Sequence, residues 1–179
     1  MRLLITRPIE DAAPLAEVLA ERGHETIIEA LMTINDVTAP DLDTDTNGVQ
    51  AVLITSANGI RAFARANAER TIPVCAVGDA SARAARELGF TQVHSAGGDV
   101  ETLAAMVEKD FNGAAGPLLH VAGTHIAGDL AGRMTQAGFE MRRVVLYEAY
   151  ASETLGPKTA AALQSGALDG VLLFSPRTA

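Results

Sequence analysis

Small polar residues follow four of the apolar segments that we predict to be strands. They are Thr6-Arg7, Thr55-Ser56-Ala57-Asn58, Gly78-Asp79-Ala80-Ser81 and Ser175-Pro176-Arg177-Thr178. Ligands of parallel α/β sheets bind beyond the carboxyl ends of the strands, where hydroxyls and free backbone N–H groups can hold carboxylate or phosphate oxygens. For any single one of these residues, capping of the following helix is the more common role. Four such ends at one sheet edge are better explained as an anion-binding rim.

Tyr147 is one of only two tyrosines and ends the apolar segment 144–147. It lies just before a predicted interdomain connection at residues 149–156. A phenol can donate a proton or a hydrogen bond to a developing charge. Taken alone, the residue pattern favours aromatic packing at a domain edge with the hydroxyl in water, and a catalytic role is the alternative.

Other potential sites lack their usual spacing. The acidic string at residues 41–45 resembles the start of a calcium loop, but Thr46 and Val52 stand where that loop needs glycine and glutamate. Cys75 lies in an apolar segment and is predicted to be core. The histidines, which show no metal-site spacing, are His24, His94, His120 and His125. We therefore expect no metal site. Glycine-rich nucleotide-binding motifs and the serine-hydrolase elbow are missing, so nucleotide-dependent and serine-hydrolase chemistries lose their usual signatures.

Composition narrows the class of protein. The chain has 179 residues, of which 48% are apolar, with a formal net charge of −8. This content is enough for a folded core and excludes collagen, coiled coil and wholesale disorder. The acidic balance argues against a nucleic-acid surface. The single cysteine, and the lack of any long apolar run, predict a cytoplasmic protein without a membrane partner.

Short apolar segments alternate with amphipathic patterns, which is typical of a parallel α/β sheet. Strands are predicted at residues 2–6, 24–28, 50–55, 73–77, 91–94, 117–121, 140–147 and 170–174. Helices are predicted from Pro8 to a stop at Gly23 and at residues 58–68, 79–88, 99–109, 126–137 and 157–163. Residues 32–35 are ambiguous, and residues 36–48 and 149–156 are predicted to be connections.

The chain contains an internal repeat. Residues 3–6 and the helix to Gly23 match residues 118–121 and the helix to Gly138, at an offset of 115. Residues 52–56 match 171–175 at an offset of 119. Two unrelated strand–helix units can look alike, but the near-constant offset favours duplication. The repeat predicts that roughly 60 further residues follow in a full-length protein, and that a form ending at residue 179 is poorly active.

Six short segments, in their order along the chain, resemble the uroporphyrinogen-III synthase family. They are Leu4-Ile5-Thr6-Arg7-Pro8, Ile54-Thr55-Ser56-Ala57-Asn58, Val77-Gly78-Asp79-Ala80-Ser81-Ala82, the strand and helix 119–138, Val145-Leu146-Tyr147-Glu148 and Leu173-Phe174-Ser175-Pro176. The resemblance implies two parallel-sheet α/β domains joined by a two-stranded linker, with the active site in the cleft between them. Domain one would be residues 1–35 plus 153–179, discontinuous and incomplete in this chain, and domain two residues 36–152. The family's second Gly-x-x-Thr-Ala element is absent here.

The implied activity is that of a cofactor-free cyclising lyase of heme biosynthesis. Hydroxymethylbilane, a linear tetrapyrrole polycarboxylate, loses water and cyclises with inversion of its terminal pyrrole ring. Because the substrate also closes unaided to the wrong isomer, the enzyme must act mainly by holding one geometry. By similarity, Tyr147 helps the hydroxyl to leave. The resemblance makes these residues substrate-binding: Thr6, Arg7, Ser56, Asn58, Gly78, Ser81, Gly123 and Ser175.

Departures and rival hypotheses accompany this resemblance. Ser81 stands where the family usually has threonine, and Arg7 could pair with a substrate carboxylate or be structural. A non-enzymatic two-domain receptor for small anions is the main alternative. A response-regulator-like module would need an acidic pocket after its first strand, where this chain has residues 6–8, Thr-Arg-Pro. The full-length protein is expected to be a monomer.

Overall fold

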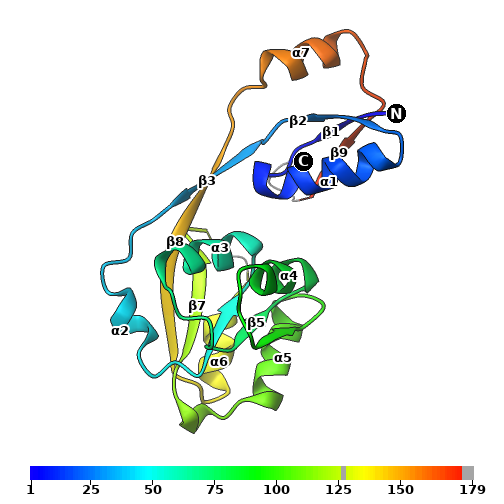
Figure 1. Cartoon of the computed structure of the whole chain (residues 1–179). Helices are drawn as coiled ribbons and strands as arrows, with labels where there is room; N and C mark the ends of the chain where they lie inside the picture. The colour runs from blue at the N-terminus through cyan, green and yellow to red at the C-terminus, as the bar shows by residue number, and fades with distance from the viewer. Residues whose placement is uncertain (126–127, 175–179) are drawn as a thin grey trace. The chain divides into compact units, whose positions relative to one another are not determined.

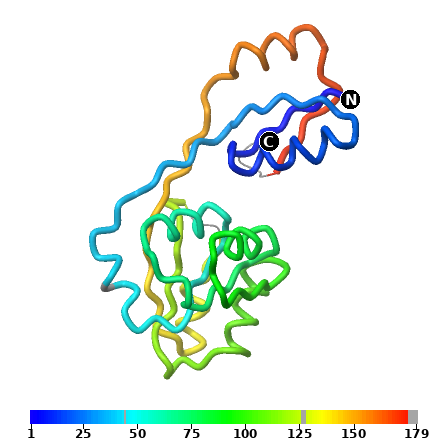
Figure 2. Tube along the Cα trace, in the orientation of Figure 1, coloured from blue at the N-terminus to red at the C-terminus, as the bar shows by residue number. Residues whose placement is uncertain are grey.

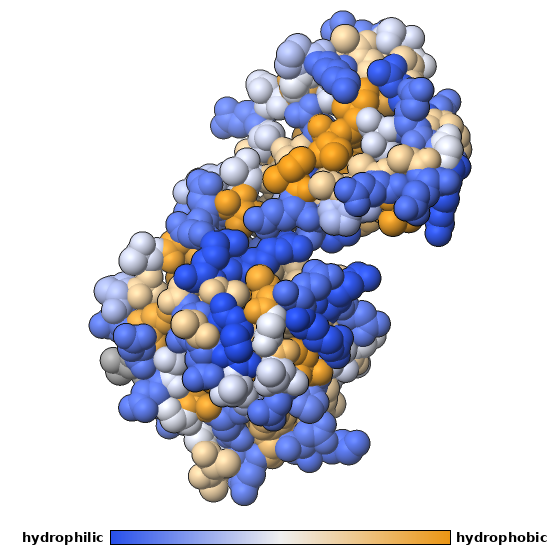
Figure 3. Space-filling view, in the orientation of Figure 1, coloured by the Kyte–Doolittle hydropathy of each residue, from blue (hydrophilic) through white to orange (hydrophobic). Residues whose placement is uncertain are grey.

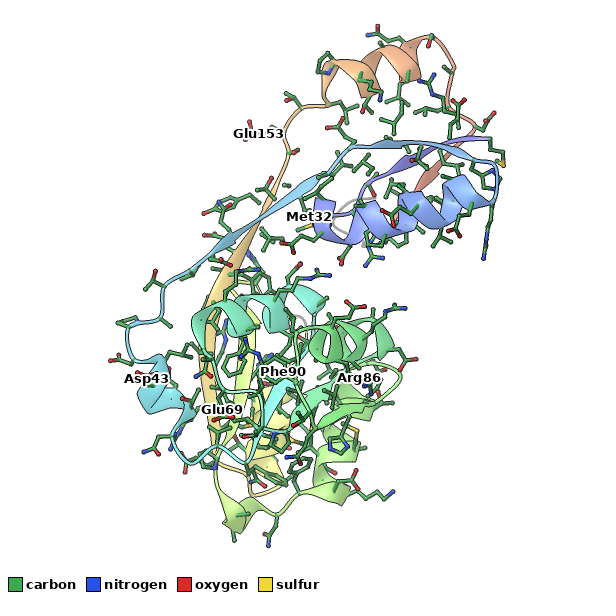
Figure 4. The ribbon with its side chains drawn as sticks, viewed as in Figure 1. Met32, Asp43, Glu69, Arg86, Phe90 and Glu153 are labelled. Atoms are coloured by element: carbon green, nitrogen blue, oxygen red, sulfur yellow. The ribbon has the colours of Figure 1, made fainter. Side chains whose placement is uncertain are left out.

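The computed structural model describes residues 1–125 and 128–174, and the chain divides into two compact units. Unit 1 comprises Met1–Asn35 and the chain from Ala149 onward, and unit 2 comprises Asp36–Glu148 (Figure 1). The chain therefore passes from unit 1 to unit 2 and back. Figure 2 traces both passages, along strands β3 and β8. Met32 begins the first passage and Glu153 follows the second (Figure 4).

Unit 1 holds a three-stranded parallel sheet in the order β2-β1-β9. Its strands are β1 (Arg2–Ile5), β2 (Glu25–Ile28) and β9 (Gly170–Leu172), and its helices are α1 (Ile9–Glu21) and α7 (Pro157–Gln164). The carboxylate of Glu29 holds the start of α7, because it accepts from the Gly156 amide at 3.1 Å and from the Thr159 hydroxyl. A carboxylate at a helix start satisfies amides that lack an intrahelical partner.

Unit 2 holds most of a six-stranded sheet in the order β3-β8-β7-β4-β5-β6, of which residues 32–35 of β3 and 149–151 of β8 belong to unit 1. Its strands are β3 (Met32–Asp36), β4 (Ala51–Ile54), β5 (Val74–Ala76), β6 (Val93–Ser95), β7 (Leu118–Gly123) and β8 (Met141–Ala151). Its helices are α2 (Leu42–Thr46), α3 (Ala57–Ala66), α4 (Asp79–Glu87), α5 (Val100–Asp110) and α6 (Leu130–Gln136), with a 3₁₀ turn at Gly113–Ala115. Parallel pairing joins β8, β7, β4, β5 and β6.

Apolar side chains cover both faces of this sheet, as expected for a parallel sheet. On one face, Leu53 and Leu118 pack with Leu103 of α5 and Met134 of α6. Helices α3 and α4 lie on the other face. The rings of Phe63 and Phe90 stack there with centroids 6.1 Å apart, and the Arg70 guanidinium lies 4.9 Å from the Phe90 ring.

The strand pairing agrees with the internal repeat residue by residue. In unit 1, Leu4 pairs with Val171, and in unit 2 their counterparts Leu119 and Val52 pair with each other. The order β2-β1-β9 thus recurs as β8-β7-β4. Each sheet therefore combines strands from both halves of the repeat.

The structure differs from the sequence prediction, or resolves its ambiguity, in four segments. Residues 36–48, predicted to be a connection, contain the short helix α2. The predicted connection at 149–156 begins as strand, because β8 continues to Ala151 and pairs with β3, and the Ser152 amide then donates to the Leu31 carbonyl. The ambiguous residues 32–35 are strand for the same reason. The helix predicted from residue 126 begins at Leu130; residues 126–127 lie outside the described part of the chain.

Apolar side chains also reach the surface of unit 1 (Figure 3). They include Ile9, Val171, Leu173 and Phe174. In a search confined to the described residues, every helix proved too short or too polar to cross a lipid bilayer.

His120 is a buried titratable residue in the middle of the six-stranded sheet. It lies on β7 between Leu53 of β4 and Arg143 of β8, and it is 3% exposed. Within the described ranges, its Nε2 atom has no hydrogen-bond partner. Burial, and secondarily the charge of Arg143, lower the pKa of His120 to about 4. The folded protein therefore holds a neutral imidazole at neutral pH.

This lowered pKa predicts acid sensitivity of unit 2 in a defined window. Below pH 6.5 the unfolded chain protonates His120, whereas the folded state takes up that proton only near pH 4. The free energy of unfolding should thus fall by about 2 kcal/mol between pH 7 and pH 5. Urea-dependent hydrogen exchange of the β7 amides measures it. The variant His120→Leu should lose most of this pH dependence, and an unchanged slope would contradict the prediction.

Candidate active site

Four neighbouring strands of unit 2 bring predicted site residues to one edge of the sheet. Strands β8, β7, β4 and β5 are adjacent and parallel, so their carboxyl ends share an edge. Gly123, Ser56 and Gly78 stand at or just beyond the ends of β7, β4 and β5, and Tyr147 lies within β8, where it pairs with Gly123. Such an edge, where helices begin, is the usual ligand-binding position of parallel α/β sheets.

The central contact of this edge joins Ser56 to Tyr147. The Ser56 Oγ and Tyr147 Oη atoms are 3.1 Å apart, and either oxygen can donate the hydrogen bond. Ser56 is also the N-cap of α3, since its Oγ accepts from the amides of Asn58 at 3.1 Å and Gly59 at 3.4 Å. The amides at the start of α3 therefore hold the Ser56 oxygen in place, and the Ser56 oxygen in turn holds the Tyr147 hydroxyl through their hydrogen bond.

A β-bulge in β8 determines where Tyr147 points. Ala122 pairs with Val145, but the next residue, Gly123, pairs with Tyr147, so that Leu146 is an additional residue in β8. One extra residue changes the face on which the following side chain lies. The bulge thereby puts the Tyr147 ring on the α3 side of the sheet, where Ser56 is.

Two glycines leave the space that the Tyr147 ring occupies. A Cβ atom on Gly123 would lie 2.8 Å from two ring atoms. A Cβ atom on Gly59 of α3 would lie 3.7 Å from the ring and 3.3 Å from the Val121 carbonyl oxygen. Tyr147 is only 9% exposed, although its hydroxyl reaches Ser56. The ring is thus packed while its polar end is directed along the sheet edge.

The other predicted residues of unit 2 lie at the starts of α3 and α4. Asn58 is in the first turn of α3, and its side-chain oxygen is 3.5 Å from Arg61 Nη1. Gly78 caps α4 through extended backbone alone. Ser81 is in the first turn of α4 and is 6% exposed, so its hydroxyl offers little surface.

The four polar strand ends do not share one sheet edge as predicted, because β1 lies in the separate three-stranded sheet of unit 1, where the predicted residues have local partners. Thr6 is buried, and its hydroxyl donates to the Leu172 carbonyl at 2.8 Å, which ties β1 to β9. The Arg7 guanidinium bonds to the Asp11 carboxylate at 3.2 Å and lies 4.7 Å from the Phe174 ring. Ser175 lies outside the described residues.

Cys75 is buried and is a poor candidate for a nucleophile. Burial, followed by the charge of Asp110, raises the pKa of the Cys75 thiol to about 12, which is unsuitable for a nucleophile. In residues 1–125 and 128–174, His, Cys, Asp and Glu side chains form no group of three or more that could hold a metal ion.

Sequence reasoning did not identify Gly59 or Arg143. Gly59 carried a usable signal, because a glycine inside a helical pattern often marks a close approach. Arg143 carried none. Its Nη2 donates to the Gly123 carbonyl at 3.2 Å, next to a bulge that the residue pattern does not reveal.

Comparison with known proteins gives a consistent result. The family model of uroporphyrinogen-III synthase HemD matches residues 13–179. No curated protein matches the chain in sequence. Among solved structures, a mutant uroporphyrinogen III synthase from Thermus thermophilus is similar at 18% identity and a TM-score of 0.57, over 96% of this chain and 71% of that one. The uroporphyrinogen-III synthetase of Helicobacter pylori is similar at 18% identity and a TM-score of 0.56, over 91% and 68%.

The structural likeness shows the fold, a mixed α/β architecture with parallel sheets. The family match is independent of it and extends over most of the sequence. This chain therefore belongs to the uroporphyrinogen-III synthase family, the cyclising lyases of heme biosynthesis.

Proposed function

We propose that Tyr147 and Ser56 form the proton-donating pair of the family's reaction. That reaction cyclises hydroxymethylbilane with loss of water and inversion of the terminal pyrrole ring. The observation that carries the proposal is the 3.1 Å contact between the two hydroxyls at the carboxyl edge of the sheet. Family membership does not favour the alternative of a non-enzymatic anion receptor.

The pair suits the departure of a hydroxyl group. A hydroxyl leaves as water only when its oxygen gains a proton, and a positioned phenol can supply a hydrogen bond or a proton. Ser56 supports the phenol, because its oxygen is itself held by the amides of Asn58 and Gly59. When the Tyr147 proton moves toward the substrate, the serine hydroxyl can donate to the phenol oxygen and stabilise the developing charge.

Substrate carboxylates would be held by groups at the same edge. The start of α4, which has no side-chain cap, presents backbone amides that carry partial positive charge, whereas the Asn58 and Gly59 amides of α3 already donate to Ser56. Asn58, Gly78 and Ser81 are the predicted binding residues at these starts, and Gly123 lies beneath the Tyr147 ring. Because the amides belong to the backbone, an acidic protein can bind an acidic substrate here.

We further propose that units 1 and 2 correspond to the two domains of the family. Domain one would hold residues 1–35 and the chain from residue 153, and domain two residues 36–152, with β3 and β8 as the two-stranded linker. The adjacency of β3 and β8 in one sheet supports this linker. Thr6, Arg7 and Ser175 would be the substrate-binding residues of domain one. The protein would act in the cytoplasm as a monomer.

The proposed reaction is tested with freshly made hydroxymethylbilane. Full-length protein should convert it to the product with the inverted ring, so that oxidation yields mainly the type III porphyrin. The isomers are separated and quantified after oxidation. Formation of the type I isomer alone, at the spontaneous rate, would overturn the activity.

The role of Tyr147 is tested by Tyr147→Phe. This change keeps the ring between Gly59 and Gly123 but removes the proton, so kcat should fall about a hundredfold with KM changed less than about threefold. The free energy of unfolding should fall by only about 1 kcal/mol, for the lost hydrogen bond to Ser56. Steady-state kinetics and urea unfolding measure the two effects.

Tyr150→Phe is the matched control for this variant. Tyr150 is the second of the two tyrosines, lies on the same strand and is 48% exposed. The same chemical change there should leave kcat unaltered. Equal kcat values for Tyr147→Phe and the wild type would show that Tyr147 only packs.

A further inference from the structure

The position of the Tyr147 ring depends on the bulge in β8. In an unbroken register, Gly123 would pair with Leu146, and Tyr147 would point to the opposite face of the sheet, toward α5 and α6. The bulge instead leaves the ring on the α3 side, within reach of Ser56. A bulge interrupts the regular hydrogen bonding of the strands, so groups that satisfy the local backbone can hold its geometry.

Arg143 supplies such a group from the other face of the sheet. It pairs with His120 in register, so these two side chains lie on the same face as Leu53, where His120 is buried and Arg143 is exposed. The lowered pKa of His120 has the charge of Arg143 as its second cause, which agrees with this placement. From there, Arg143 Nη2 donates to the Gly123 carbonyl at 3.2 Å, on the strand that faces the bulge.

The Tyr147 ring lies so close to the Gly123 backbone that no side chain fits between them. A Cβ atom at residue 123 would meet ring atoms at 2.8 Å and the phenol oxygen at 3.2 Å. The ring thus rests on the backbone whose carbonyl Arg143 holds. The Tyr147 carbonyl also accepts from the Thr124 amide at 3.1 Å, which fixes the main chain of the two strands at this point.

We propose that Arg143 is a positioning residue. It holds Gly123 and the adjoining bulge, so that the Tyr147 hydroxyl stays within hydrogen-bond distance of the Ser56 hydroxyl. The proposal rests on the function proposed for Tyr147 in the loss of the substrate hydroxyl. A charge-assisted bond to a carbonyl is stronger than a neutral one. A displacement of about 1 Å in a reacting group can cost about a hundredfold in rate.

Fluorine NMR of protein labelled with 3-fluorotyrosine tests the positioning directly. Within residues 1–179 only Tyr147 and Tyr150 give signals, and Tyr150→Phe assigns them. In Arg143→Met the Tyr147 signal should broaden or shift toward the position of the exposed Tyr150. In Arg143→Lys, which keeps a cationic donor, the shift should be smaller. Arg142→Met is the matched control, because Arg142 donates to the Asn47 carbonyl and to Glu140 instead, and it should leave the Tyr147 signal unchanged.

Kinetics of the same variants in the full-length protein complete the test. Arg143→Met should lower kcat about tenfold or more with little change in KM, and Arg143→Lys should recover part of that loss. A raised KM with unchanged kcat would instead make Arg143 a substrate-binding residue and overturn the proposal. Urea unfolding of each variant establishes that unit 2 remains folded.

The two measurements separate this inference from the function proposed for Tyr147. If the NMR signal moves in Arg143→Met while neither this variant nor Tyr147→Phe loses rate, the positioning holds and the catalytic role of Tyr147 is wrong. If the Tyr147 signal does not move in Arg143→Met, the positioning is wrong whatever the rate. A moved signal together with a lowered kcat supports both.

Discussion

The one-residue bulge in β8 is the constraint on which the candidate site depends. A parallel sheet fixes alternate side chains to alternate faces, and β8 would by that rule direct Tyr147 into the α5–α6 core. The extra residue, Leu146, lets both Leu146 and Tyr147 be buried while the tyrosine hydroxyl reaches the start of α3. Glycine at position 123 then becomes necessary, because any larger residue would collide with the ring.

The internal repeat accounts for the strand order around the candidate site. Strands β8, β7 and β4 are the counterparts of β2, β1 and β9, and the pairing registers coincide. Each sheet takes strands from both halves of the repeat, so neither half completes a sheet alone. The bulge lies in the copy that contains Tyr147. The bulge at Ala122/Gly123 lies beyond the residues of β7 that correspond to β1, and up to that point both copies pair without interruption.

Much of the fold could be predicted from the sequence because it rests on local patterns. Buried parallel strands are continuous apolar runs, and glycines such as Gly23 and Gly138 have positive φ after helices as their position suggests. The strand character of residues 32–35 and 149–151 could not be predicted, because it comes from the pairing of β3 with β8, which are far apart in the chain. Short polar segments such as α2 carry equally little signal of their own.

The candidate site was predictable in its residue types but not in its geometry. Ser56 was singled out as a hydroxyl at a strand end, and Tyr147 was assigned a catalytic role by the family resemblance; both assignments stay predictions. Their direct contact, and the bond from Arg143 to Gly123, follow from a bulge, and a bulge depends on register between strands that are separate in sequence. For Thr6, by contrast, the structure shows a buried hydroxyl that ties β1 to β9.

The chemistry of the site fits the charge of the molecule. A carboxylic acid as proton donor would be ionised at neutral pH in a solvated site, and its charge would repel a polycarboxylate. A pair of hydroxyls avoids this repulsion, and the partial charges of helix starts add attraction that does not depend on basic side chains. The formal charge of −8 therefore opposes nucleic-acid binding without opposing an acidic substrate. Arg143 donates to the Gly123 carbonyl from the other face of the sheet. In the proposed role it therefore positions Tyr147 through the backbone without contacting the substrate.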